Sequence, residues 1–235
     1  MEPQIVFQDD FVMVVNKPSG MISTNARSTR KKPTLQNWLR RQDYSLARDF
    51  EIRSGIVHRL DKETSGLIIV AKDKDIFSKL QALFKNRLVK KKYLTLVHGI
   101  VEPKEGIIDA PVGRLPWNRE RFGVLAGGRE AITKYKVLRL YQKDKDKYSE
   151  LELEPKTGRT HQIRIHLKHL GYPIVGDTFY AGRKRSREDR TWCPRLFLHA
   201  AKISFDHPVT NRFISVQSDL PLDLKRAASL LKTVV

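Results

Sequence analysis

Apolar residues cluster along the chain in short runs that are typical of β-strands. Residues 67–71 (Leu-Ile-Ile-Val-Ala) form a continuous, mostly β-branched run bounded by turn residues, which predicts a buried strand. Residues 5–7 and 11–15 flank Gln8-Asp9-Asp10 and predict a hairpin. The hairpin is expected to end in a turn at residues 16–20 (Asn-Lys-Pro-Ser-Gly).

Further strands follow from alternating or continuous apolar positions. They are predicted at residues 88–97, 132–140, 148–153, 196–206 and 212–217. Residues 99–131 are rich in Gly and Pro and predict turns with short strands. The chain is therefore expected to be built mainly on β-structure.

Three segments have the spacing of helices. Thr34 is a candidate cap for a short helix that carries Leu35, Trp38 and Leu39 on one face. Ile76, Leu80, Leu83 and Phe84 recur at helical intervals, with Asp75 as the expected cap and Asn86 as the end. A last helix is expected from Asp223, with Leu224, Ala227, Ala228 and Leu231 on its buried side.

Residues 160–171 fit either a strand or a helix by periodicity alone. Thr160 is a good helix N-cap, Gly171 suits the position just beyond a helix end, and basic residues suit the last turn. These ends predict a helix. Arg164 is then expected in its first turn, where exposed N–H groups can also meet phosphate.

The charge balance indicates a polyanionic partner. The 235 residues carry 45 Lys and Arg against 26 Asp and Glu, a formal net charge of +19. No basic amphipathic helix with a bulky apolar face is evident, so nucleic acid is favoured over a membrane surface. At 40% hydrophobic and 30% charged residues, the length suits one sizeable core or two closely joined lobes.

Several classes of protein are disfavoured. Cys193 is the single cysteine, and the histidines at 161, 166 and 169 have no carboxylate or thiol at ligand spacing, so we expect no disulfide framework and no metal. The phosphate-binding patterns GxxxxGK[ST] and GxGxxG are absent, which argues against a nucleotide cofactor. The beginning of the chain lacks the plan of a signal peptide, and we expect a soluble, cytoplasmic protein.

Polar residues gather before the buried strand at 67–71. His58-Arg59-Leu60-Asp61 and Thr64-Ser65-Gly66 lead directly into it. Ionisable groups held against the end of a buried strand are costly unless they are paired or used. A carboxylate such as Asp61 can act as a nucleophile or general base when a cation keeps it ionised and oriented.

The chain resembles the RluA-type pseudouridine synthases, which isomerise uridine within RNA. The stretches that carry the resemblance are Asp10–Gly20, His58–Gly66, Lys91–Leu94, Gly158–Arg164 continuing to Gly176-Asp177, and Leu198-His-Ala200. They lie in the family's order and span roughly residues 5 to 217. An isolated His-Arg-Leu-Asp would be a weak signal, whereas the ordered set is specific.

The resemblance implies roles for individual residues. Asp61 matches the catalytic aspartate, Tyr93 the tyrosine that packs on the base, and Arg164 the arginine that pairs with the aspartate. Arg59 matches the arginine that enters the RNA stack when the target uridine is flipped out. The remaining candidates for RNA binding are His58, Lys91, Lys92 and Arg159. The residues expected to hold the loop as scaffold are His58, Thr64, Ser65 and Gly66.

The resemblance also implies a fold and an activity. We expect an α+β protein with a mainly antiparallel mixed β-sheet, flanked by helices and loops and crossed by a central active-site cleft. Residues 1–235 would form a single catalytic domain without a separate N-terminal RNA-binding domain, a monomer without cofactor or metal. Its predicted activity is conversion of uridine to pseudouridine in structured ribosomal or transfer RNA.

Two other activities are compatible with the same residues. One is a non-catalytic RNA-binding or RNA-folding protein on the same fold. The other is a metal-independent nuclease or glycosylase acting on RNA. The basic loops at residues 25–33, 99–131 and 181–195 are the segments expected to choose the RNA.

Overall fold

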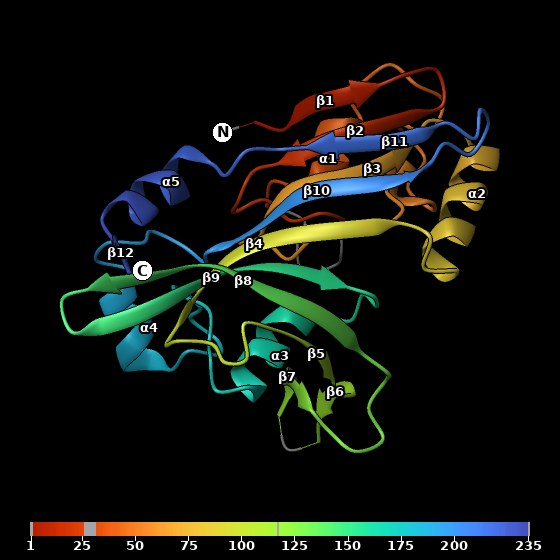
Figure 1. Cartoon of the computed structure of the whole chain (residues 1–235). Helices are drawn as coiled ribbons and strands as arrows, with labels where there is room; N and C mark the ends of the chain where they lie inside the picture. Colours follow the sequence, from red (N-terminus) through yellow and green to blue (C-terminus); the bar gives the residue numbers. More distant parts are fainter. Residues whose placement is uncertain (1, 26–31, 117, 235) are drawn as a thin grey trace. The chain divides into compact units, whose positions relative to one another are not determined.

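A computed structural model describes residues 2–25, 32–116 and 118–234 of the chain (Figure 1). The chain forms two compact units. Unit 1 comprises Met1–Lys91 and Ala200–Asp219, and unit 2 comprises Lys92–His199 and Leu220–Val235. Most of the predicted basic loop at 25–33 lies outside the described residues.

Strands dominate the secondary structure. Their bounds are β1 Gln4–Gln8, β2 Val12–Lys17, β3 Ser65–Ala71, β4 Lys90–His98, β5 Glu105–Asp109, β6 Val112–Leu115, β7 Asn118–Val124, β8 Ile132–Lys143, β9 Asp146–Pro155, β10 Leu198–Asp206, β11 Phe213–Gln217 and β12 Lys232–Val234. The helices are α1 Leu35–Leu39, a 3-10 turn η2 at Arg53–Gly55, α2 Lys74–Lys85, α3 Gln162–His169, α4 Arg183–Asp189 and α5 Leu222–Ser229. The predicted α+β class with a mostly antiparallel sheet is confirmed.

Unit 1 is built around β3, all of whose residues are buried. β3 pairs antiparallel with β2, which pairs antiparallel with β1, and β10 pairs with β11. A strand buried on both faces needs an unbroken apolar run, which explains the continuous sequence of residues 67–71. Gly66 at its start has φ +121°, and a Cβ there would lie 2.3 Å from the Ala200 carbonyl oxygen. Only glycine allows β10 to approach this closely.

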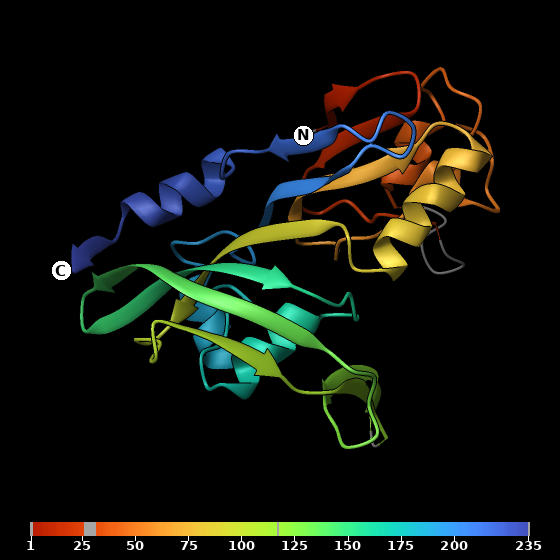
Figure 2. The same ribbon diagram turned by 45° about the vertical axis from the view of Figure 1, so that its right-hand side comes forward.

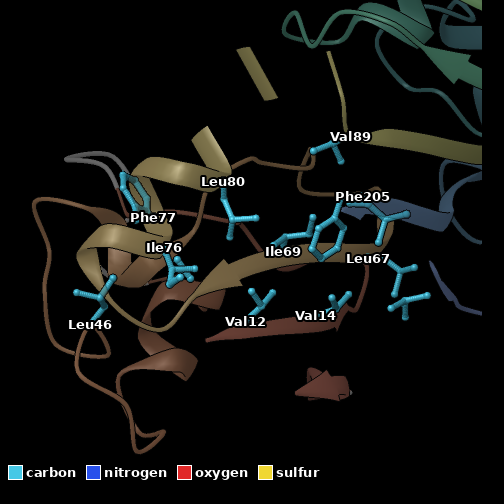
Figure 3. Close-up of a cluster of buried hydrophobic side chains, with 13 residues drawn as sticks. Val12, Val14, Leu46, Leu67, Ile69, Ile76, Phe77, Leu80, Val89 and Phe205 are labelled. Carbon is cyan, nitrogen blue, oxygen red and sulfur yellow. The ribbon is translucent and has the colours of Figure 1, made fainter. Parts of the chain in front are cut away.

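The core of unit 1 lies between this sheet and α2. The residues that form it include Val12, Val14, Leu67, Ile69, Ile76, Phe77, Leu80, Ile203 and Phe205 (Figure 3). Each contributing strand supplies alternate positions and α2 supplies one face, as the sequence periodicity predicts. Asp73 caps α2 by accepting from the Ile76 N–H at 2.9 Å, so the expectation of Asp75 as the cap was wrong.

Unit 2 is organised on the long β8–β9 hairpin. β9 also pairs antiparallel with β4, and β8 pairs antiparallel with both β5 and β12. β6 and β7 form a separate two-stranded ribbon, and α3 contacts β7 (Figure 1). The prediction of short strands and turns between residues 99 and 131 is confirmed.

The ambiguous segment is a helix, α3. At its end the Gly171 N–H donates to the Lys168 carbonyl and the Tyr172 N–H to the Leu167 carbonyl, with Gly171 at φ +88°. This is a Schellman motif and confirms the predicted role of Gly171. The N-cap is His161 rather than the predicted Thr160, and its backbone is left-handed at φ +55°.

The other helix predictions are mixed. Thr34 caps α1 by accepting from the Asn37 N–H at 3.0 Å, as expected. The segment 181–195 is not wholly a loop, because Arg183–Asp189 forms α4.

In the described part of the chain, no helix is both long and apolar enough to cross a membrane.

Candidate active site

The loop that carries Asp61 is held by hydrogen bonds within the loop and by bonds to Ser19 and Ser23, which lie earlier in the chain. The Ser23 hydroxyl donates to the Leu60 carbonyl at 2.8 Å and accepts from the Leu60 N–H at 3.0 Å. The Ser19 hydroxyl donates to the Glu63 carbonyl, and the Thr64 N–H to the Asp61 carbonyl. The backbone on both sides of Asp61 is thus fixed, while the Asp61 residue is only half-buried.

Lys17 contributes a buried positive charge to this support. Its residue is fully buried, and its ammonium donates to the carbonyls of Pro18 at 2.9 Å, Met21 at 2.8 Å and Lys62 at 3.4 Å. A buried ammonium must be compensated, and charge-assisted bonds to carbonyls do so here. The Asn-Lys-Pro-Ser-Gly turn therefore ties the end of β2 to the residue that follows Asp61.

His58 is part of the same scaffold. Its Nε2 accepts from the Ile69 N–H at 3.0 Å, and its ring lies 4.7 Å from that of Phe84. Burial, assisted by the charge of Lys91, lowers the pKa of His58 to about 3. The imidazole is therefore neutral near pH 7, and its hydrogen bond to the Ile69 N–H ties it to β3.

Lys91 lies beside this histidine at the start of β4. Its ammonium is 5.8 Å from the centre of the Phe84 ring. Burial lowers the pKa of Lys91 to about 8. The side chain is still mostly protonated at neutral pH, and it loses its charge on mild alkalinisation.

Arg164 of α3 is buried in unit 2 and held by a carboxylate. Its Nε and Nη2 each donate to an oxygen of Asp177 at 2.8 Å, and Asp177 is fully buried. The guanidinium also lies over the rings of Phe179, at 5.6 Å, and Tyr180, at 5.1 Å. Such a bidentate pair fixes both the plane and the position of the guanidinium.

Asp177 also shapes the turn in which it lies. Its Oδ1 accepts from the Phe179 N–H at 2.9 Å and from the Tyr180 N–H at 3.0 Å. Gly176 before it has φ +74°, and a Cβ there would lie 2.3 Å from the Arg195 carbonyl oxygen. Glycine at position 176 therefore allows the backbone to approach the Arg195 carbonyl closely. The next residue, Asp177, then accepts from Arg164.

The remaining candidates are distributed between the two units. Arg59 is exposed in unit 1. In unit 2, Tyr93 is buried on β4 opposite Leu153 of β9, and Lys92 pairs with Glu152 at 2.7 Å.

Arg159 precedes α3 and is held through both its side chain and its backbone. Its Nε donates to the Glu130 carbonyl at 2.9 Å, and its N–H donates to the Gln162 side-chain oxygen, also at 2.9 Å. This residue therefore helps to fix the chain that leads into the helix.

The structure divides the predicted residues between the two units. The first contains His58, Arg59, Asp61 and Lys91, and the second contains Lys92, Tyr93, Arg159 and Arg164. The cleft and the pairing of Asp61 with Arg164 both join the two units, and they remain predictions.

Asp177 and Lys17 contact the candidate site residues or their loop, but no role was predicted for either from the sequence. Asp177 directly follows Gly176 in one of the family motifs, and this glycine–aspartate pair was the sequence pattern that could have indicated its role. For Lys17 the pattern was its position directly after a buried apolar strand, because a buried lysine needs acceptors inside the protein. Neither pattern identifies which partner the charged group meets.

Metal-ligating side chains do not cluster in the described ranges. Among residues 2–25, 32–116 and 118–234, no group of three or more His, Cys, Asp or Glu could hold a metal ion.

Comparison with protein families gives one match over most of the chain. Residues 11–169 match the RNA pseudouridylate synthase family.

The proteins similar to the chain include two curated relatives and one solved structure. The large ribosomal subunit pseudouridine synthase D of Pseudomonas aeruginosa is 37% identical over 240 residues, covering 99% of this chain and 72% of that protein. The dual-specificity RNA pseudouridine synthase RluA of Escherichia coli O157:H7 is 41% identical, covering 87% of each. The structure of human RNA pseudouridylate synthase domain containing 1 superposes with a TM-score of 0.75 at 27% identity, over 99% of this chain and 89% of that one.

Proposed function

Because the chain belongs to the RluA-type branch of the RNA pseudouridylate synthase family, we propose that Asp61 is the residue with which it isomerises uridine to pseudouridine in RNA. In this reaction the bond between N1 of uracil and the ribose breaks, and a new bond forms between carbon 5 and the ribose. Carbon 5 gives up its hydrogen as a proton and N1 gains one. The RNA keeps its mass and its length.

The single observation that supports Asp61 most is the bracing of its loop. Ser23, Ser19 and the Lys17 ammonium fix the backbone around Asp61, and the residue as a whole is half-buried. A reacting carboxylate gains from such preorganisation because little reorganisation is then needed in the transition state. A carboxylate that served only as a surface ion would not need it.

The second set of residues supplies the expected partners. A guanidinium has five N–H donors, so Arg164 can serve the carboxylates of Asp177 and Asp61 together. Tyr93 would pack on the uracil, and Arg59 would occupy the gap that the flipped uridine leaves in the RNA stack. Flipping is required because the glycosidic bond is inaccessible while the base is stacked.

The substrate that we propose is ribosomal or transfer RNA. The Pseudomonas relative is named for the large ribosomal subunit and the Escherichia relative for dual specificity. A net charge of +19 favours phosphate contacts, with affinity that falls steeply as salt rises. We propose that the protein acts as a monomer in the cytoplasm.

The test is release of tritium from RNA labelled at carbon 5 of uridine. The wild-type protein should release the label from a ribosomal or transfer RNA, and Asp61→Asn should reduce release by about 10³-fold or more while RNA binding is retained. Asp75→Asn is the matched control, because the Asp75 carboxylate is exposed on α2 and pairs only weakly with Lys79 in solvent. Full activity of Asp61→Asn would show that another residue carries the chemistry. Shortened RNA or free uracil would instead indicate a nuclease or glycosylase.

A further inference from the structure

Three aromatic side chains from separate segments of unit 2 lie in a row, and the Arg164 guanidinium lies over one of them, Phe179. They are Phe122 of β7, His161 at the cap of α3, and Phe179 in the turn after Asp177. The ring of His161 is 6.1 Å from that of Phe122 and 6.0 Å from that of Phe179, with interplanar angles of 66° and 63°. We refer to Phe122, His161 and Phe179 as the aromatic row.

The exposure of Phe179 distinguishes this ring from ordinary core packing, whereas Phe122 is partly buried against a small core. Phe179 is 47% exposed, although the carboxylate of Asp177 clamps its backbone N–H at 2.9 Å. Its neighbour Tyr180 is buried and completes a small core with Val112 and Ile165. The turn thus buries the ring of Tyr180 and exposes that of Phe179, while Asp177 fixes the backbone of both residues.

The backbone of His161 is strained in a way that serves the row. Its φ of +55° lies in the left-handed region, which costs free energy in a residue with a Cβ. Nδ1 of His161 and the hydroxyl oxygen of Tyr180 are 2.9 Å apart, so the imidazole is oriented between the two phenylalanines. Strain of this kind persists where the surrounding structure imposes it, and it is concentrated at functional sites.

Cations accompany the rings. The Arg114 guanidinium lies 5.2 Å from the centre of the Phe122 ring, and the Arg164 guanidinium lies 5.6 Å from that of Phe179. The β6–β7 ribbon that carries Arg114 and Phe122 extends away from the β8–β9 hairpin (Figure 2). Aromatic faces next to guanidinium groups are the usual platform for unstacked nucleobases, with phosphates nearby.

We infer that the aromatic row binds an unpaired nucleobase of the RNA substrate, next to the uridine that is modified. This inference rests on the proposed function, since it assumes an RNA partner. Flipping a uridine leaves its neighbours partly unstacked, and a platform that stacks one of them offsets that cost. The row would then strengthen RNA binding without taking part in bond breaking.

The test compares Phe179→Ala, Phe179→Leu and Phe179→Tyr with the wild-type protein. KM for tritiated RNA and direct binding of a single-stranded RNA oligonucleotide are measured for each folded variant. Phe179→Ala and Phe179→Leu should raise KM and weaken binding by about 10-fold with kcat nearly unchanged, whereas Phe179→Tyr should resemble the wild type. Phe213→Ala is the control, because Phe213 is 67% exposed on β11 of the other unit and should show no change.

The outcomes separate this inference from the proposed function. Wild-type binding by Phe179→Ala, or by Phe179→Leu, would overturn stacking as the role of this ring. A fall in kcat with unchanged KM would also overturn it, because Phe179 would then act only by supporting Arg164. Weakened oligonucleotide binding by Phe179→Ala, in a protein that releases no tritium from any RNA, would leave the row supported and reject the synthase activity.

Discussion

The two units hold their candidate catalytic side chains by different physical means. In unit 1, Asp61 lies in an irregular loop that is fixed through its backbone, by Ser23 and by the buried ammonium of Lys17. In unit 2, Arg164 lies on a helix and is fixed through its own guanidinium, by the buried carboxylate of Asp177. The first arrangement acts on the backbone around the candidate reactive group, whereas the second acts on the charged group itself.

This difference fits the roles proposed for the two residues. A carboxylate that attacks or accepts a proton has to change its bonding during the reaction, so the scaffold grips the backbone around it. A guanidinium that only orients a charge can be held permanently, because its plane and position do not have to change during the reaction. The units should therefore respond differently when their supports are removed.

The largest expected effect is that of Asp177→Asn in unit 2. It removes the carboxylate that compensates a buried guanidinium, and breaking such a pair from one side costs about 3–5 kcal/mol. The free energy of unfolding, measured in urea, should fall by this amount, and activity should fall with the loss of Arg164 orientation. Asp144→Asn is the control, because Asp144 is 82% exposed in the β8–β9 turn and should change stability little. A stable, active Asp177→Asn variant would mean that the aromatic rings alone hold Arg164.

A smaller effect is expected from Lys17→Met in unit 1. It removes the donor shared by three carbonyls while filling the same space, and bonds from a charged donor are worth about 1.5–3 kcal/mol each before repacking offsets part of the loss. We expect a net cost of about 2 kcal/mol, together with a fall in kcat because the loop around Asp61 loosens. Urea unfolding and tritium release measure the two quantities. Lys145→Met, at an exposed position, should leave both unchanged, and an unaltered kcat in Lys17→Met would show that Ser23 and Ser19 suffice.

The smallest effect concerns pH and His58. Its pKa is lowered to about 3 when the protein is folded, against an ordinary value of 6.5. Between these values the unfolded chain binds the extra proton, so the contribution of neutral His58 to stability is complete above pH 6.5 and declines as the pH falls. The free energy of unfolding should therefore drop by about 1 kcal/mol more in the wild type than in His58→Gln between pH 7 and pH 5.5. Parallel stability profiles for the two proteins would exclude this role of His58.

Local features of the fold could be predicted because they depend on neighbours in the chain. The apolar run at 67–71, the Thr34 cap and the Schellman end at Gly171 each involve residues within a few positions of one another. Where two nearby residues could serve equally well, the choice failed: Asp73 rather than Asp75 caps α2, and His161 rather than Thr160 caps α3. The errors arise because a cap depends on backbone angles that residue propensity does not specify, and they displace the helix starts by only one or two residues.

The family, the excess of positive charge and the stretches expected to carry the chemistry could all be predicted without coordinates, because they depend only on motif order and composition. The partners of the charged groups became known only from the folded chain. In the folded chain Arg164 donates to Asp177, the Lys17 ammonium donates to three carbonyls, and His58 accepts from the Ile69 N–H of β3. The physical reason is that burying a charge or an imidazole is tolerable only where acceptors or donors converge in space, and that convergence is a property of the folded chain.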